Sequence, residues 1–285
     1  MQMRVLQATE MGMCFGVKDA LDRTLRLEEP ERVTIHGELV HNPVVTRALA
    51  ARGFRARSEE HREGGGEVDR LLITAHGVSA REKKRLSEHA TELIDTTCPL
   101  VSRVHRTVRQ LAEEGWFVVV LGKPGHVEVQ GIIGDLDRYA VVCDLRDAKD
   151  WNVDRIAIVC QTTMMVDRAR ALMGRVRSRN RSAVVRFHDT ICDPTKQRIL
   201  AVDALIPRVQ AMVVVGGHNS NNTRQLVRRC RARGLPTFQV QDASELHASR
   251  LESFDVVGLT AGTSTLDQTI VEVFAALQCM GAVRR

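Results

Sequence analysis

Short apolar runs alternate with amphipathic stretches along the whole chain. The apolar runs are rich in valine and isoleucine, which is typical of buried strands. The stretches between them repeat apolar residues at helical spacing, as in 17–27, 42–53, 99–115 and 267–280. Strands that alternate with helices favour parallel sheets. We therefore predict an α/β fold with parallel sheets and strands within 5–9, 33–37, 70–76, 92–97, 117–122, 140–145, 155–161, 183–188, 212–217, 237–241 and 255–261.

Three cysteines mark a repeat within this alternation. Cys14, Cys98 and Cys192 each follow an apolar run and precede a helical one. Two polar loops come at similar distances after each cysteine: first LVHN, GHVE or HNSNN, then TAHG, CQTT or TAGTS. This repeat predicts three α/β units, 1–97, 98–190 and 191–285, arranged about a pseudo-threefold axis with the site at its centre.

Composition narrows the class of protein. Hydrophobic residues make up 44% of the 285 and aromatic residues only 4%, so aliphatic side chains must fill the cores. No apolar run approaches the roughly 18–20 residues of a membrane span, and the first residues lack the apolar core of a signal peptide. We expect a cytoplasmic protein with no membrane partner, whose seven widely spaced cysteines do not form a disulfide framework.

The net charge of +6 raises the question of a nucleic-acid partner. Most basic residues are spread along helical segments, and only the run 175–186 is dense. We interpret that run as a solvated helix end, with docking of an acidic partner or nucleic acid as the alternative. Familiar DNA- and RNA-binding motifs are absent, so no nucleic-acid partner is expected. The charged, glycine-rich segment 58–69 is interpreted as a surface loop.

The recurring cysteines suggest a metal centre. Zinc sites commonly show cysteines close together in sequence, whereas here each thiol comes from a separate repeat. Three thiolates fill three corners of a cubane cluster and leave one iron open to substrate. A single cysteine is more often a small buried hydrophobe, and we apply that interpretation to the four that do not recur: Cys143, Cys160, Cys230 and Cys279.

The polar loops carry groups suited to a small, highly charged anion such as a diphosphate. His41, His76 and His126 follow strands in polar loops, and imidazolium binds phosphate oxygens well. The third unit offers uncharged donors instead, which also suit turn and helix-cap roles: Ser220, Asn221, Asn222 and Ser264.

Glu128 is the only carboxylate inside these loops and is therefore the candidate proton donor. Burial beside a metal centre is expected to raise its pKa enough for acid catalysis. The alternative is a glutamate that only stabilises the first turn of a helix. Thr162 and Thr163 follow a predicted strand and are expected to orient that carboxyl or a substrate hydroxyl.

Nine motifs across almost the whole chain resemble those of the 4-hydroxy-3-methylbut-2-enyl diphosphate reductase family: GMCFGV, HGELVHN, TAHGVS, DTTCPLV, GHVEVQG, QTT, DTICDPTKQR, NSNNT and TAGTS. The resemblance implies three α/β units around a central [4Fe–4S] cluster with the ligands Cys14, Cys98 and Cys192. It implies that Glu128 delivers protons and that Thr162 positions the reacting hydroxyl. The implied diphosphate ligands are His41, His76, His126, Ser220, Asn222 and Ser264, with Asn221 at a position where the family mostly has serine.

The resemblance further implies reductive dehydroxylation of an allylic diphosphate, (E)-4-hydroxy-3-methylbut-2-enyl diphosphate, to isopentenyl and dimethylallyl diphosphate. The expected electron donor is ferredoxin or flavodoxin, acidic proteins suited to a basic surface. Two alternatives stay open. A hydro-lyase would remove water without an external reductant, and a non-enzymatic cluster-based redox sensor would bind duplex DNA in a salt-dependent way.

Overall fold

The computed structural model describes residues 3–58 and 66–282. Over these residues the chain forms twelve strands in three four-stranded sheets, and every pairing in them is parallel. The predicted α/β class with parallel sheets is therefore confirmed. Of the predicted loop 58–69, residues 59–65 lie outside the described part, and 68–69 begin a strand.

The three sheets are named here by their order along the chain. The first sheet has the order β3 (Arg55–Ala56), β2 (Val33–Ile35), β4 (Val68–Ile73) and β5 (Ala90–Asp95). The second has the order β7 (Tyr139–Val142), β6 (Phe117–Leu121), β8 (Arg155–Cys160) and β9 (Val184–Phe187). The third has the order β1 (Arg4–Gln7), β12 (Val256–Ala261), β10 (Ala211–Val215) and β11 (Thr237–Val240).

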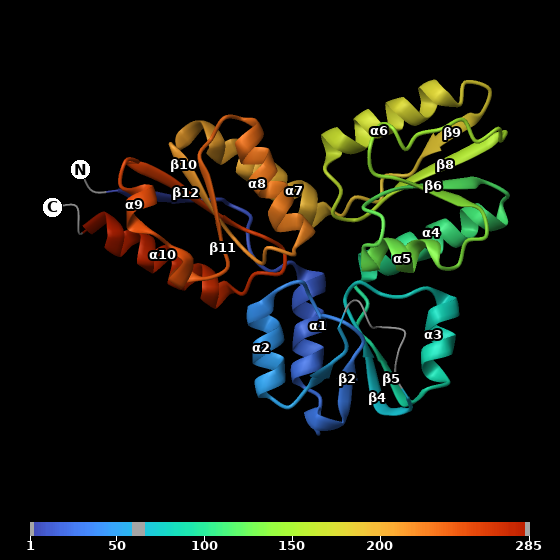
Figure 1. Cartoon of the computed structure of the whole chain (residues 1–285), viewed down its shortest axis with the longest axis horizontal. Helices are drawn as coiled ribbons and strands as arrows, with labels where there is room; N and C mark the ends of the chain where they lie inside the picture. The colour runs from blue at the N-terminus through green and yellow to red at the C-terminus, as the bar shows by residue number, and fades with distance from the viewer. Residues whose placement is uncertain (1–2, 59–65, 283–285) are drawn as a thin grey trace. The chain divides into compact units, whose positions relative to one another are not determined.

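All three sheets share one topology. In the first and second sheets, the first strand along the chain lies between the second and the third, and the fourth pairs with the third at the edge. The third sheet reaches the same order only because β1 supplies its fourth strand, with Arg4 opposite Val256 and Gln7 opposite Leu259. Figure 1 shows this N-terminal strand in blue beside β12.

The place of β1 differs from the predicted division, which assigned this strand and Cys14 to the unit 1–97. The physical reason is that parallel strands pair with partners remote in sequence, and β1 pairs with β12. In the folded chain each sheet is therefore followed by its cysteine, whereas the predicted repeat begins with it. The boundaries after residues 97 and 190 stay a prediction.

Two compact units divide the chain. One comprises Met1–Lys18, Val40–Ala48 and Asp193–Arg285 and contains the third sheet. The other comprises Asp19–Leu39 and Leu49–Cys192 and contains the first and second sheets. We call them the outer-segment unit and the middle-segment unit. Each carries part of the predicted site.

Helices form most of the connections between the strands, as is usual in parallel sheets. They are α1 (Phe15–Leu25), α2 (Pro43–Ala51), α3 (Ala80–Ser87), α4 (Pro99–Glu113), α5 (Val127–Ile133), α6 (Val166–Arg179), α7 (Asp193–Leu205), α8 (Asn221–Ala232), α9 (Ala248–Leu251) and α10 (Asp267–Ala282), with short 3-10 turns at Pro30–Arg32, Ile206–Arg208 and Ala243–Glu245. Among the described residues, no helix has both the length and the apolar character needed to cross a membrane.

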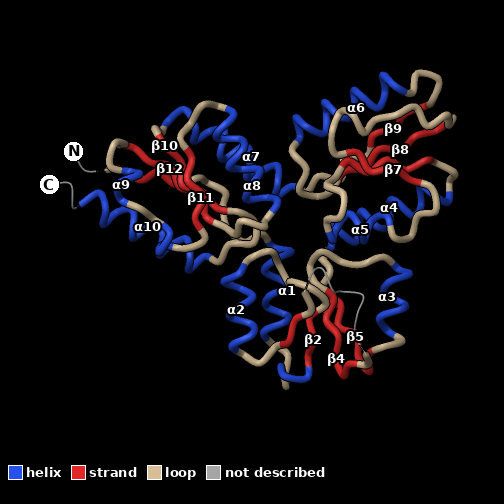
Figure 2. The backbone as a smooth tube through the Cα atoms, in the orientation of Figure 1, coloured by secondary structure: helices blue, strands red, loops and turns tan. Residues whose placement is uncertain are grey.

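The second sheet shows how the cores are built. Figure 2 shows α4 and α5 on one side of its strands and α6 on the other. Val104 and Val108 of α4 pack with Val129 of α5 in one buried cluster, whereas Leu172 and Val176 of α6 belong to a second. Because both faces are covered, β6 and β8 read as continuous apolar runs in the sequence.

The pairing of β1 yields a matched test of the third sheet. The N–H of Ala8 donates to Leu259 of β12 and that of Arg4 to Asp255 directly before β12. Strand alternation therefore directs the N–H of Leu6 to β12 and that of Val5 away from it. Leu6→Pro is expected to lower the free energy of unfolding by about 1–3 kcal/mol more than Val5→Pro, since only the first removes a ladder bond. Chemical denaturation of both variants measures the difference, and equal losses would contradict the pairing.

Candidate functional site

The three recurring cysteines occupy the same place in the three sheets. Each follows a fourth strand and directly precedes a helix, which is α1, α4 or α7. Each backbone N–H donates to a carbonyl in the loop after the third strand of the same sheet: Cys14 to Thr263 at 3.1 Å, Cys98 to Ala75 at 3.1 Å and Cys192 to Thr162 at 3.0 Å. All three residues are partly exposed. The sequence repeat is thus reproduced as an equivalent local geometry.

The joint binding of a metal by these thiols is a separate question. Cys14 belongs to the outer-segment unit, whereas Cys98 and Cys192 belong to the middle-segment unit. In the described part of the chain, no group of three or more His, Cys, Asp or Glu side chains is gathered for a metal ion. The structure therefore defines the setting of each thiol, and a shared cluster stays a prediction.

Glu128 is buried in the first turn of α5, with 2% of its surface exposed. Its Oε1 accepts the backbone N–H of Thr162 at 2.6 Å. The carbonyl of Thr162 in turn accepts the N–H of Cys192. The backbone of Thr162 therefore connects the candidate acid to a candidate metal ligand.

His126 forms the N-terminal cap of α5. Its Nδ1 accepts the backbone N–H of Glu128 at 3.2 Å. A neutral imidazole that accepts at Nδ1 carries its proton on Nε2, so this ring presents an N–H donor without needing to be an imidazolium. The ring of His76 lies edge-on to it, with 5.9 Å between centroids. Two of the three predicted histidines therefore lie together in the middle-segment unit.

The loops before α2 and after β12 meet in the outer-segment unit. Ser264 Oγ donates to the carbonyl of His41 at 3.4 Å, and the carbonyl of Ser264 accepts Nδ2 of Asn42 at 2.6 Å. Asn42 Oδ1 also accepts the N–H of Val44 at 2.9 Å and so caps α2. Asn42 is 4% exposed and was not among the predicted site residues. The signal for it was an asparagine directly before a proline that begins a helix.

The loop before α8 supplies the other predicted donors of this unit. Ser220 caps α8, and its Oγ accepts the N–H of Thr223 at 3.3 Å. Asn222 is 3% exposed, and its Oδ1 accepts the N–H of Thr263 at 3.0 Å. Asn221, the first residue of α8, is partly exposed between them. Ser220 and Asn222 are therefore fixed at the N-terminal end of one helix.

Glu128 and Asn222 are structural equivalents. Each is the second residue of the helix after the first strand of its sheet, and each accepts the N–H of the loop after the third strand. The accepting loop residue, Thr162 or Thr263, then accepts a cysteine N–H. An amide performs this task at Asn222, so the hydrogen bond does not require an ionisable group. The equivalent position in the second sheet carries an ionisable group, Glu128.

The cysteines outside the repeat have different surroundings. Cys160 and Cys230 are fully buried, and burial raises the pKa of the Cys230 thiol to about 12. Cys279 is exposed on α10. A thiol with a pKa near 12 stays protonated at neutral pH and is a poor metal ligand. These surroundings agree with the sequence interpretation of Cys230 as a structural residue.

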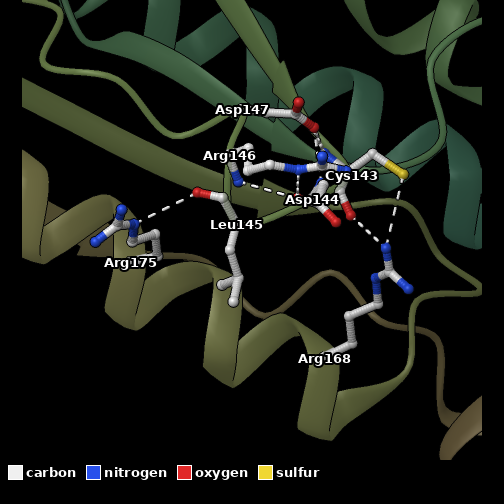
Figure 3. Close-up of polar contacts among 7 residues, drawn as sticks. All are labelled: Cys143, Asp144, Leu145, Arg146, Asp147, Arg168 and Arg175. Carbon is white, nitrogen blue, oxygen red and sulfur yellow. Dashed lines mark hydrogen bonds and ion pairs between the residues drawn. The ribbon is translucent and has the colours of Figure 1, made fainter.

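Cys143 lies in the turn after β7, where Figure 3 shows it between two charged groups. The carboxylate of Asp147 accepts the N–H groups of Cys143 at 2.9 Å and of Asp144 at 2.7 Å. Arg168 of α6 donates to the carbonyl of Cys143, and its Nη2 lies 3.9 Å from the sulfur. These contacts hold α6 against the turn.

The basic run 175–186 also has structural contacts. Its first five residues form the end of α6, as the helix-end interpretation predicts. Arg175 donates to the carbonyl of Leu145 at 3.4 Å (Figure 3). The guanidinium of Arg186 lies 4.8 Å from the centroid of the Trp116 ring. Part of the run therefore contributes to packing around the second sheet.

Comparison with known proteins gives consistent matches along the chain. The family model described as LytB protein matches residues 5–278. The chain is 32% identical over 283 residues to the 4-hydroxy-3-methylbut-2-enyl diphosphate reductase of Caldanaerobacter subterraneus subsp. tengcongensis, covering 98% of both chains. It is 33% identical over 283 residues to the protein of the same name from Aquifex aeolicus, covering 96% of both.

Two solved structures share the fold. The E-1-hydroxy-2-methyl-but-2-enyl-4-diphosphate reductase from Plasmodium falciparum superposes with a TM-score of 0.87 at 24% identity, covering 96% of this chain and 88% of that one. A structure described as (E)-4-hydroxy-3-methyl-but-2-enyl diphosphate reductase, the terminal enzyme of the non-mevalonate pathway, has a TM-score of 0.68 at 32% identity. That match covers 97% of this chain and 99% of the other.

Proposed function

The chain belongs to the LytB protein family, and on this premise we propose that it reductively dehydroxylates (E)-4-hydroxy-3-methylbut-2-enyl diphosphate. Two electrons and two protons replace the C–O bond with a C–H bond and release water. The products are isopentenyl and dimethylallyl diphosphate. The observation that carries the proposal is the repeated setting of Cys14, Cys98 and Cys192, each with its N–H held by the loop after a third strand.

A reductase of this family needs a redox cofactor. We propose one [4Fe–4S] cluster with Cys14, Cys98 and Cys192 as ligands. The donor set fits, since three partly exposed thiols stand at equivalent places of the repeat, each directly before a helix. When bound, such a cluster supplies electrons one at a time and keeps one iron without a protein ligand. We infer ferredoxin or flavodoxin as the electron donor and the cytoplasm as the location.

The diphosphate is proposed to bind groups whose acceptor atoms are already engaged. His126 Nδ1, Ser220 Oγ and Asn222 Oδ1 each accept a backbone N–H. Their remaining polar atoms carry hydrogens, and phosphate oxygens bind such donors. The same role is proposed for His41, His76, Asn221 and Ser264.

Proton delivery is assigned to Glu128. The bond from the Thr162 N–H fixes Oε1, and Oε2 of the same carboxyl is proposed to carry the transferred proton. The side chain of Thr162 is 95% buried at the same place and is proposed to orient the reacting hydroxyl. Burial at this position keeps bulk water from competing with the carboxyl as the proton source.

The proposed function is tested by an anaerobic assay of the purified protein after iron and sulfide reconstitution. We expect turnover of the hydroxylated diphosphate to require a low-potential reductant and to yield both isomeric products. A hydro-lyase would consume the substrate without reductant. A redox sensor would leave it unchanged and bind duplex DNA with strong salt dependence.

The cysteine assignment predicts two classes of variant. Replacing Cys14, Cys98 or Cys192 by Ser should remove most of the roughly four irons per chain expected for a cubane cluster. The matched control is Cys230→Ser, because that thiol is buried and protonated at neutral pH. Iron and sulfide analysis measures both classes. Iron lost from the Cys230 variant and kept by the Cys14 variant would refute the assignment.

The substitution Glu128→Gln tests whether Glu128 delivers a proton or only accepts a structural hydrogen bond. The glutamine amide can accept the Thr162 N–H as Asn222 accepts that of Thr263, so fold and iron content should be retained. Turnover should fall by about 10²–10⁴-fold, as for a lost general acid. Glu128→Ala is the comparison, because it also leaves a buried N–H without its acceptor and should lower stability by about 1–3 kcal/mol. Turnover of the glutamine variant near that of the parent would remove Glu128 from proton delivery.

A further inference from the structure

A buried arginine of α7 contacts the turn before Cys14. Arg198 has only 4% of its surface exposed. Its Nε and Nη2 donate to the carbonyl of Gly12 at 3.2 and 2.6 Å, and its Nη1 donates to the carbonyl of Pro194 at 3.0 Å. In the sequence, Gly12 lies two residues before Cys14 and Pro194 two residues after Cys192. One guanidinium is therefore bonded to the main chain beside two of the proposed ligands.

The internal repeat shows that this position does not require an arginine for packing. The sixth residue after each recurring cysteine is Ala20 in α1, Val104 in α4 and Arg198 in α7. All three are buried, with 0%, 1% and 4% of their surfaces exposed. Burial of a charge is costly even when it is hydrogen-bonded. A charge at a place where the other repeats have small aliphatic residues points to a function.

The contacted turn is already tightly built. Gly12 has a φ of +77°, and a Cβ there would lie 2.7 Å from Ile270 Cδ1. Its N–H donates to Ala261, and the N–H of Cys14 donates to Thr263. Arg198 holds the Gly12 carbonyl of the same turn. The main chain before Cys14 is thus fixed by β12, by the loop after it and by α7.

We propose that Arg198 is a positioning residue that holds the Cys14 turn for the cluster and that its charge makes the bound cluster easier to reduce. The inference rests on the proposed function, since it needs an iron–sulfur cluster at Cys14. Three thiolates give an oxidised [4Fe–4S] site a net negative charge, and reduction adds one more. A buried cation close to the site favours the more negative, reduced state.

The test uses the full chain, reconstituted anaerobically, with three substitutions. Arg198→Gln removes the charge and keeps two N–H donors, whereas Arg198→Lys keeps the charge and loses the planar fork. Arg198→Met introduces an aliphatic side chain like those at Ala20 and Val104. Arg177→Gln, on the exposed end of α6, is the matched control. The measurements are iron content, the midpoint potential followed by electron paramagnetic resonance, and the unfolding temperature before reconstitution.

We expect the Gln variant to hold iron with a lower midpoint potential. At the potential where the parent is half reduced, its ratio of reduced to oxidised cluster should fall about tenfold, and this fall corresponds to a shift of about 59 mV for a one-electron couple. The Lys variant should stay within threefold of the parent, and the Arg177 control should not change. The Met variant should unfold at a temperature no lower than the parent's and yet retain less iron. That combination separates positioning from a purely structural role.

Two results would overturn the proposal. One is a Gln variant that titrates at the parental potential, and the other is a Met variant that unfolds earlier and loads iron normally. A parent protein that takes up no cluster would contradict the proposed function and the inference together. A parent that turns over, with a Gln variant of unchanged potential, would contradict the inference alone.

Discussion

In each sheet of this protein a backbone hydrogen bond joins the cysteine after the fourth strand to the loop after the third strand, and the arrangement of the candidate site depends on it. The net contribution of such a bond to stability is only about 0.5–1.5 kcal/mol, but a buried N–H left without its acceptor costs more. The bond joins two loops at the carboxyl ends of neighbouring strands, where ligand sites in parallel sheets are found. It therefore sets the position of a thiol relative to the polar residues of the neighbouring loop.

The same bond explains why Glu128 and Asn222 correspond. Each side chain holds the N–H of the threonine whose carbonyl holds a cysteine. In both cases a side chain in the first turn of a helix is linked to a cysteine through the backbone of one threonine. Two sheets of the chain use the same geometry, one with an amide and one with a carboxylic acid. The difference between these two groups is chemical, since both accept one N–H in the same way.

Much of this could be predicted from the sequence, because parallel strands buried on both faces leave continuous apolar runs. All eleven predicted strand segments overlap strands of the structure, and the remaining strand, Arg55–Ala56, has only two residues and no apolar run. The sheet joined by β1 could not be predicted, since its partner β12 lies at the other end of the chain. A local hydrophobic pattern predicts whether a segment is a strand or a helix, but it does not predict which strand pairs with which.

Within the site, residue type and repeat position were enough to select the cysteines and Glu128 as candidates. They were not enough for Asn42 and Arg198, whose contacts come from segments remote in sequence: Ser264 for the first and Gly12 for the second. The proton position on His126 likewise depends on the helix cap at Glu128. Such features follow from hydrogen-bond geometry, which a linear pattern does not specify.

The pairing of β1 with β12 also bears on how the protein is made. During synthesis the strand Arg4–Gln7 emerges long before its partner Val256–Ala261. Until then the N–H of Cys14 has no Thr263 carbonyl to bond, and the third sheet has no fourth strand. Contacts between such distant segments form slowly. A chain that has not yet been extended past Thr263 therefore lacks the setting of its first recurring thiol, and only a longer chain can present all three cysteines in equivalent geometry.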